Sequence, residues 1–523
     1  MVERADKTVG MTANKTIAVN AMASYARTFY AVVLGLFSGR WTLMALGQTD
    51  YGLMGVIGGL TVFISFVNSL MASSVGRFYA FAVGRAAISK GDEGLEESRK
   101  WFNTALLLHT AFPIVAMCVG YPVGVWLVEH YLTIPPDRIG ACVWVWRFVC
   151  VSCFVGMVNV PFQAMYTAKQ EIAELTVYSF VTSTLNVLFL YYMINHPGVW
   201  LAKFMAWTCC LSIFPQIVIC VRAVIKYPEC RLVLRYLWNC GRIRQIATFA
   251  GGRLVCGFSQ VFVNQGTAIL VNKMLGPVRN ATMGIGNSVS GYCLRFSGSF
   301  TTAFSPAITN AAGAGDLKRM KDLVYATCSV AGLAMIMFAL PLCLEIDGVL
   351  ALWLKSPPPD SAVICVIMLL SAVCNCISDG LWMGIFAVGK VFAFQTWESI
   401  AWFLVVPVGY VLVKAGMGIS GVALSILLAR FAAIFVKLHF ARKHCGISAM
   451  SWGRKVFLPL LVVTLAAGGA GFAVRMSMAQ SILRILTTCF CSEVILFGIA
   501  WKLVLPESAR GKVLAYIGIK SNS

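Results

Sequence analysis

Five arginines lie within long apolar runs of the chain, at Arg27, Arg147, Arg253, Arg295 and Arg430. An arginine guanidinium is permanently charged and donates paired hydrogen bonds of fixed geometry to anions such as phosphate. Burying one near the middle of a bilayer costs at least about 2.5–3.5 kcal/mol, so each must face a polar interior, a partner or an interface. All five are candidate anion-binding residues, and the structural alternative for each is snorkelling to an interface.

Two carboxylates also fall inside apolar runs, at Asp379 and Glu398. A carboxylate in such a place can bind Na⁺ or exchange a proton, so both residues are candidates for a coupling-ion site. The alternative is a structural pair with a neighbouring group such as Lys390. No HExxH, P-loop or paired-carboxylate motif occurs and the five histidines lack ligand spacing, so neither a catalytic site nor a bound metal is expected.

The composition places these charges in a membrane. Of the 523 residues, 59% are hydrophobic and only 12% are charged, and the mean hydropathy is +0.79. A soluble chain of this length would carry far more charge, whereas apolar runs of roughly twenty residues, long enough to cross about 30 Å of hydrocarbon, recur here. The first apolar run continues without a cleavage site, so we expect a membrane helix there and not a removable signal.

Polar, Gly-rich and Pro-rich breaks divide the chain into about fourteen expected transmembrane helices. They are expected at residues 16–39, 52–76, 104–129, 140–163, 174–194, 201–225, 245–272, 281–304, 323–345, 361–387, 392–414, 419–441, 456–476 and 481–505. The sequence therefore predicts an all-α integral membrane protein with short loops.

Lysines and arginines gather in three clusters that all fall on one side of these helices. Two run from Arg77 to Lys100 and from Arg222 to Arg244, and the third comprises Lys437, Arg442, Lys443, Arg454 and Lys455. The positive-inside rule makes this side, and with it both termini, cytoplasmic. Attraction to anionic membrane lipids then explains the net charge of +21, and nucleic acid is not expected as a partner. The segment 231–245 forms either a basic interfacial helix or a plain loop.

One connector is written twice in the chain. LGQTDYGLMG at 46–55 recurs as LGPVRNATMG at 275–284, 229 positions later, and SKGDEGLEESRK at 89–100 resembles AGAGDLKRMKD at 312–322. The offset covers six expected helices, an even number, so corresponding helices run in the same direction. Such repeats are related by a pseudo-twofold axis along the membrane normal and occur in transporters with a substrate site between the halves. We expect two six-helix lobes and two additional C-terminal helices.

Three stretches resemble a known family. MLGPVRNATMGIGNSVSGYCLRFSGSFTTAFSPAITNAAGAGDLKRMKDLVY at 274–325 is similar to the corresponding part of bacterial lipid-linked oligosaccharide flippases, the O-antigen and capsule repeat-unit translocases. These form the polysaccharide transporter branch of the multidrug/oligosaccharidyl-lipid/polysaccharide (MOP) exporter superfamily. LGQTDYGLMGVIGG at 46–59 and AVGKVFAFQ at 387–395 resemble the family as well, and the helix order agrees over nearly the whole chain.

The resemblance implies a two-lobed bundle around a cavity that opens alternately to the two sides of the bacterial cytoplasmic (inner) membrane. The N-terminal lobe would cover residues 1–225 and the C-terminal lobe 245–441. A basic cytoplasmic connector at 226–244 would join them, and helices 13 and 14 with a cytoplasmic tail would occupy 442–523. The implied cargo is an undecaprenyl-diphosphate-linked oligosaccharide, moved from the cytoplasmic to the periplasmic leaflet, and polysaccharide assembly proteins are further expected partners.

In relatives, helices 1, 2, 7 and 8 line the cavity. Arg27, Arg253 and Arg295 lie on helices 1, 7 and 8, so the resemblance makes them the expected diphosphate-binding residues, whereas the other two intramembrane arginines belong to more peripheral helices. Arg77 and Arg85 follow helix 2 at the expected cytoplasmic entrance. They either receive the incoming phosphate or only follow the positive-inside rule. No cofactor is expected apart from a coupling Na⁺ or H⁺.

Two other functions suit the same fold, a multidrug exporter and a lipid II flippase. An exporter of cationic drugs would favour acidic residues in an apolar cavity, whereas arginines outnumber acids in the presumed cavity helices. An enzyme that polymerises or ligates O-antigen chains would carry a large external loop with catalytic residues, and every expected external loop here is short. The sequence therefore predicts a secondary transporter or flippase and not an enzyme.

Overall fold

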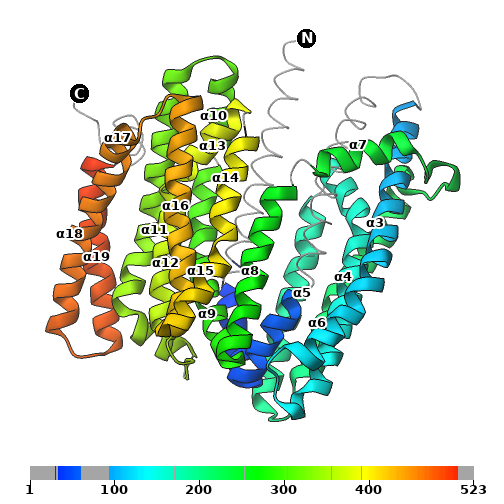
Figure 1. The fold of residues 1–523 in the computed structure, drawn as a ribbon, viewed down its shortest axis with the longest axis horizontal. Helices are drawn as coiled ribbons and strands as arrows, with labels where there is room; N and C mark the ends of the chain where they lie inside the picture. The colour runs from blue at the N-terminus through cyan, green and yellow to red at the C-terminus, as the bar shows by residue number, and fades with distance from the viewer. Residues whose placement is uncertain are drawn as a thin grey trace, which may run out of the picture. The chain divides into compact units, whose positions relative to one another are not determined.

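The computed structural model describes the helical body of the chain, at residues 30, 33–60, 93–169, 172–251, 254–302, 304–354, 356–389 and 391–504. All regular elements in these ranges are helical (Figure 1). Nine helical segments within them are long and apolar enough to cross a membrane. The expectation of an all-α, multi-pass membrane protein is confirmed.

The chain forms two compact units, Met1–Pro277 and Val278–Ser523. Besides the helical residues 33–59, the first unit contains α3 (Glu93–Trp126), α4 (Ile139–Ala168), α5 (Ile172–Asn195), α6 (Leu201–Lys226), α7 (Cys240–Gly251) and α8 (Leu254–Leu275). The second contains nearly all of α9 (Pro277–Thr302), then α10 (Ser305–Gly313), α11 (Leu317–Leu354), α12 (Ser361–Cys376), α13 (Asp379–Val388), α14 (Phe392–Phe403), α15 (Val405–Leu412), α16 (Gly418–Cys445), α17 (Ala449–Trp452), α18 (Leu458–Ser477) and α19 (Ile482–Leu503). The lobe boundaries that the sequence suggests stay a prediction.

Close packing holds the helices of the first unit together. Phe102 of α3 and Phe162 of α4 meet edge to face with ring centres 5.1 Å apart, and Tyr166 meets Tyr227 in the same way at 5.2 Å. Around them lies a buried cluster that joins α3, α4 and the end of α6. Lipid is as apolar as these side chains, so van der Waals contact between fitted surfaces, and not escape from water, stabilises the bundle.

The segment after α6 contains two short 3-10 helices, Pro228–Cys230 and Leu234–Tyr236, and is attached to α3. Asn103 donates from Nδ2 to the carbonyl of Arg231 at 3.1 Å and accepts from the backbone N–H of Val233 at 2.8 Å. One side chain thus satisfies the backbone of a connector that has no strand to pair with. Leu232 and Trp238 remain 61% and 72% exposed. Helix α7 begins only at Cys240, so the structure favours the loop over a continuous interfacial helix at 231–245.

Both copies of the duplicated connector share a backbone feature. Gly47 and Gly276, 229 positions apart, have φ angles of +76° and +85°, a conformation that residues with a Cβ rarely adopt. Position 50 is likewise 229 residues before position 279. Asp50 pairs with Arg138 at 3.2 Å in the first unit, and Arg279 pairs with Asp360 in the second. The turn geometry and the site of an ion pair therefore recur in both units, with the charges exchanged.

Helices α18 and α19, the expected additional pair, lie side by side and pack against α11 (Figure 1). The backbone of α11 is kinked at Glu345, which has φ −118° and is 1% exposed. Arg484 of α19 donates to Glu345 Oε2 from Nη2 at 2.8 Å and from Nε at 3.2 Å, and Thr488 donates to Oε1 at 3.1 Å. A buried, fully bonded carboxylate thus fastens α19 to the kink.

Replacing Arg484 with alanine leaves the Glu345 carboxylate buried without its partner, which costs about 3–5 kcal/mol in other proteins. We expect Arg484→Ala to lower the apparent Tm of the detergent-solubilised protein markedly. The matched control is Arg319→Ala, because Arg319 is an exposed arginine on the same helix as Glu345. Equal Tm losses in the two variants would contradict the role given to Glu345.

Candidate functional site

A break between α12 and α13 brings polar groups into the interior of the second unit. Ser378 leaves the helical backbone conformation (φ −116°, ψ 0°) and α13 begins at Asp379. A carboxylate at the first residue of a helix is stabilised by the positive end of the helix dipole. Asp379 Oδ1 also accepts a hydrogen bond from Asn375 Nδ2 at 3.2 Å. The break therefore holds a carboxylate within a segment whose mean hydropathy reaches 2.3.

Arg430 of α16 reaches the same break. Its Nη1 donates to Asn375 Oδ1 at 2.8 Å, and its guanidinium carbon lies 4.3 Å from the centre of the Trp402 ring on α14. The first contact is a charge-assisted hydrogen bond and the second a cation–π interaction. Asn375 consequently links Arg430 to Asp379, because its amide accepts from one and donates to the other.

Lys437, two turns further along α16, pairs with the second intramembrane acid. Its Nζ donates to Ser378 Oγ at 3.1 Å and lies 3.9 Å from Glu398 Oε1 on α14. Lys437 is 3% exposed, so it is a buried partner and not a member of the surface-lying basic cluster to which the sequence assigned it. The partner of Glu398 is therefore Lys437, whereas Lys390 lies outside the described residues.

We refer to these groups as the ionic cluster, which consists of Asn375, Ser378, Asp379, Glu398, Arg430 and Lys437. Its two acids and two bases give a formal charge of zero. Ser378 and Lys437 are buried, whereas Asp379, Glu398 and Arg430 keep part of their surface exposed. A neutral cluster has no excess negative charge to hold a cation, so Na⁺ or H⁺ can bind only when an acid exchanges its basic partner for the ion.

Helices α8 and α9 each present polar side chains on an exposed face. On α9, Asn287 and Arg295 are exposed and lie within about 80° of each other around the helix, while Ser297 is buried. On α8, Gln260 and Asn264 are exposed one turn apart. Neither helix contains an aspartate or a glutamate. Polar groups facing hydrocarbon are costly, so each of these faces must meet water or protein.

The C-terminal end of α8 is bound to the loop that follows α3. Asn272 is fully buried, and its side chain exchanges two hydrogen bonds with the backbone of Thr133, at 2.9 and 3.4 Å. Lys273 Nζ donates to the carbonyl of Tyr131 at 3.0 Å and lies 5.0 Å from the centre of its ring. The first long helix of the predicted C-terminal lobe is thus attached to a loop of the predicted N-terminal lobe.

By sequence, no family model and no curated protein matches the chain. By fold, the chain is similar to the lipid II flippase MurJ in an inward closed conformation, with a TM-score of 0.66 and 12% identity over 94% of this chain and 99% of that chain. It is similar to an inward-facing multidrug resistance MATE family transporter of the MOP superfamily, with a TM-score of 0.62 and 12% identity over 82% and 98%. A MOP superfamily transporter from Pyrococcus furiosus matches with a TM-score of 0.53 and 13% identity over 83% and 96%. This is the fold of the MOP-superfamily transporters.

Within the MOP fold, the structure describes only part of the predicted site. Arg295 lies exposed on α9 with its guanidinium carbon 5.9 Å from the centre of the Tyr292 ring. Arg27, Arg77, Arg85 and Arg253 lie outside the described residues, so their binding and entrance roles stay predictions.

Arg147 illustrates the structural alternative for an intramembrane arginine. It is exposed on α4, donates from Nε to the hydroxyl of Tyr121 at 3.2 Å and lies 4.6 Å from the centre of the Trp144 ring. Aromatic and hydroxyl contacts of this kind hold a charged head where a side chain snorkels towards polar surroundings. Arg147 is therefore a suitable control in tests of Arg295.

The ionic cluster contains three residues that sequence reasoning missed, Asn375, Ser378 and Lys437. One signal was available in the spacing, because Asn375 and Asp379 are four residues apart and Arg430 and Lys437 are seven apart, and in an unbroken helix each of these spacings puts two residues on one face. The contacts that join α12 and α13 to α14 and α16 leave no such mark in a single sequence.

The pairing of Glu398 with Lys437 can be measured by a double-mutant cycle. Lys437→Met removes the base from a buried pair and leaves Glu398 uncompensated, so we expect a loss of about 3 kcal/mol in unfolding free energy. Glu398→Gln in the same chain should restore most of that loss. Lys414→Met, at an exposed lysine near Tyr410, serves as the control. Additive losses in the double variant would show that the two residues do not interact.

Proposed function

We propose that the protein is a flippase that moves an undecaprenyl-diphosphate-linked oligosaccharide from the cytoplasmic to the periplasmic leaflet of the bacterial inner membrane. Transport would proceed by alternating access with both termini in the cytoplasm. The observation that carries this proposal is the character of α9, a 26-residue helix with an exposed arginine, an exposed asparagine and no acid. Such a face suits an anionic headgroup and disfavours a cationic one.

The chemistry of the headgroup supports this choice. A diphosphate offers several charged oxygens, and an arginine guanidinium binds two of them at once. In the proposed site Arg295 acts with Arg27 and Arg253, the other two arginines of the expected cavity helices. Arg77 and Arg85 would receive the diphosphate at the cytoplasmic entrance. Exposed amides such as Asn264 and Asn287 would donate and accept hydrogen bonds with the sugar hydroxyls.

Alternating access requires that α8 can change its neighbours. Asn272 and Lys273 hold its C-terminal end to the loop after α3 by three hydrogen bonds that involve backbone groups of Tyr131 and Thr133. Single hydrogen bonds contribute only about 0.5–1.5 kcal/mol each. An attachment of this size can break during a transport cycle, so we propose that it closes the protein on the non-cytoplasmic side.

Two alternatives share the fold. A lipid II flippase, the function of the similar MurJ structure, would bind the same diphosphate and differ only in the attached glycan. A multidrug exporter would bind chiefly apolar cations, which Arg295 and the absence of acids on α8 and α9 disfavour. Transport assays that compare different glycans on the same polyprenyl diphosphate distinguish the proposed function from a lipid II flippase. Transport assays with cationic dyes distinguish it from a multidrug exporter.

The ionic cluster is the proposed site of coupling to an ion gradient. Asp379 and Glu398 each pair with groups that a proton or Na⁺ would replace, so ion binding would release Asn375, Arg430 or Lys437 from its present contact. These partners lie on α12 and α16, and the two acids lie on α13 and α14, so releasing the partners changes how four helices pack. A small ion can thereby bias the conformation of the second unit.

We expect Arg295→Ala to reduce transport by about tenfold or more, since a hydrogen bond to a charged group contributes about 1.5–3 kcal/mol. Arg295→Lys should keep part of the activity, because the charge remains and the paired geometry is lost. The measurement uses the purified protein in liposomes that contain a polyprenyl-diphosphate-linked oligosaccharide, whose arrival in the opposite leaflet is read by lectin binding.

Arg147→Ala is the matched control for Arg295→Ala, because it removes another exposed arginine, from α4. It should transport at nearly the wild-type rate. Wild-type transport by Arg295→Ala, both in liposomes and in surface polysaccharide display by a deletion strain, would refute the proposed headgroup site.

For coupling, we expect Asp379→Asn to abolish the stimulation of transport by an imposed Na⁺ or proton gradient. The slow transport that occurs without a gradient should remain. The amide keeps the size of the side chain and cannot exchange a proton. Asp347→Asn on α11, where the carboxylate is 66% exposed, should leave the stimulation intact. The assignment is wrong if Asp379→Asn responds to both gradients as the wild type does.

A further inference from the structure

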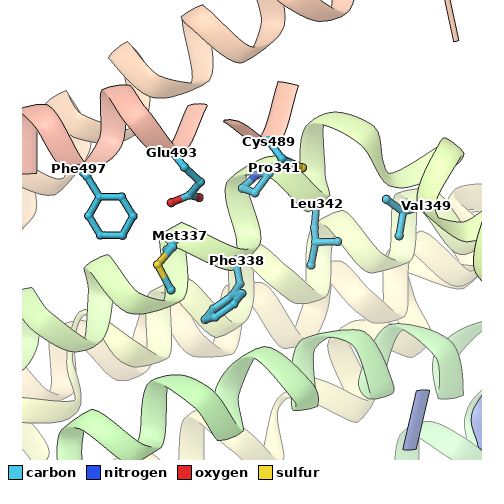
Figure 2. Close-up of a pocket in the computed structure, with 8 residues that line it drawn as sticks. All are labelled: Met337, Phe338, Pro341, Leu342, Val349, Cys489, Glu493 and Phe497. Atoms are coloured by element: carbon cyan, nitrogen blue, oxygen red, sulfur yellow. The ribbon is translucent and has the colours of Figure 1, made fainter. Parts of the chain in front are cut away.

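A cavity lies between α11 and α19, and none of the residues that line it belongs to the ionic cluster or to α9 (Figure 2). It has a volume of about 460 Å³, which is in the range of cavities that hold small organic ligands. Its walls are almost entirely apolar, and they include Met337, Phe338 and Leu342 of α11 and Phe497 of α19. Phe497 is 54% exposed, so the cavity is open at its edge.

One carboxylate points into this cavity. Figure 2 shows the side chain of Glu493 extending from α19 towards Met337 and Phe338 on α11. Both of its oxygens are shielded from solvent, and neither has a hydrogen-bond partner among the described residues. Glu345, the other acid between these two helices, is bonded to Arg484 and Thr488. Neither Arg484 nor Thr488 is bonded to Glu493. Glu493 is therefore the polar group that the cavity offers to a ligand.

The depth of Glu493 restricts what the ligand can be. It is the twelfth of the 22 residues of α19, so at about 1.5 Å per residue it lies roughly 16 Å from either helix end, near the middle of the bilayer. The amine of an ordinary phospholipid stays at the membrane surface and does not reach this depth. The partner must carry its polar group into the hydrocarbon.

The negative charge of an ionised Glu493 determines which charge the polar group of the ligand can carry. An anion would be repelled by the carboxylate, so the diphosphate of the proposed cargo does not fit here. A carboxylic acid and an amine that meet in the cavity share one proton, and the pair is neutral overall whether the proton remains on the acid or moves to the amine. Neutral pairs avoid most of the cost of placing a charge in hydrocarbon.

We propose that this cavity is a binding site for a lipophilic amine. The hydrocarbon part of the ligand packs against the apolar side chains of α11, and its nitrogen forms a hydrogen-bonded ion pair with Glu493. The acid gives its proton to the neutral amine, so a carboxylate and an ammonium group replace a carboxylic acid and an amine. The site is independent of the proposed flippase cargo, because it takes the opposite charge.

The test uses dodecylamine as the probe and the full-length protein in neutral phosphatidylcholine nanodiscs. Radiolabelled dodecylamine should show one saturable site, and Glu493→Gln should weaken its binding at least tenfold. Asp347→Asn, which removes an exposed acid from α11, should bind as the wild type does. A Tm measurement on Glu493→Gln, with an unchanged value expected, keeps a folding defect from being read as lost binding.

A chemical readout checks the same site without a variant. Dicyclohexylcarbodiimide modifies protonated carboxyl groups in hydrocarbon, and peptide mass spectrometry locates the product. We expect labelling at Glu493, protection by dodecylamine and no protection by dodecanol at the same concentration. Equal protection by dodecanol would identify a groove for any alkyl chain and overturn the proposal, as would equal dodecylamine binding by the wild type and Glu493→Gln. Neither result bears on transport by the arginine site.

Discussion

A charge inside the membrane must have a partner, and the second unit is organised around this constraint. Glu345 is enclosed at the kink of α11 and bonded to Arg484, which fixes α19 in place. Glu398 and Lys437 compensate each other across α14 and α16. Hydrocarbon contacts alone discriminate poorly between helix arrangements, because lipid offers the same contacts. These ionic contacts therefore select which helices lie next to each other, and the apolar side chains then pack to fit.

The ionic cluster of the second unit is neutral as a whole, whereas α9 contains arginine and no acid, and this difference suits the proposed flippase. The ionic cluster sums to zero, so it can be exposed to either side of the membrane without moving net charge. Helix α9, which carries Arg295, contains arginine and no acid in its own sequence. An arriving diphosphate would neutralise that side chain and its expected companions. The loaded protein would then change conformation with less net charge in its centre.

Helix positions were largely predictable from the sequence, whereas contacts between helices were not. Hydropathy and Gly/Pro breaks gave the ends of α6 and α16 within a few residues, because crossing the bilayer fixes length and composition. The same signals placed Asp379 and Glu398 inside the membrane. They could not reveal that Lys437 faces inward, because a basic residue near a helix end fits the positive-inside rule equally well. They also missed the break at Ser378, since an apolar run hides a short non-helical step.

The duplicated connector shows which features of a repeat are structural. Gly47 and Gly276 both keep the positive φ that the turn requires, so the backbone rule survives in both units. The ion pairs beside them occupy equivalent positions, yet Asp50 supplies the acid in the first unit and Arg279 the base in the second. A residue that binds a charged cargo loses this role when its charge is reversed. An ion pair that joins a turn to a neighbouring loop keeps its role when the acid and the base exchange places. The swapped pairs therefore stabilise the turns, and the proposed cargo site is to be sought elsewhere, on α9, where the exposed Arg295 belongs to a helix that contains no acid.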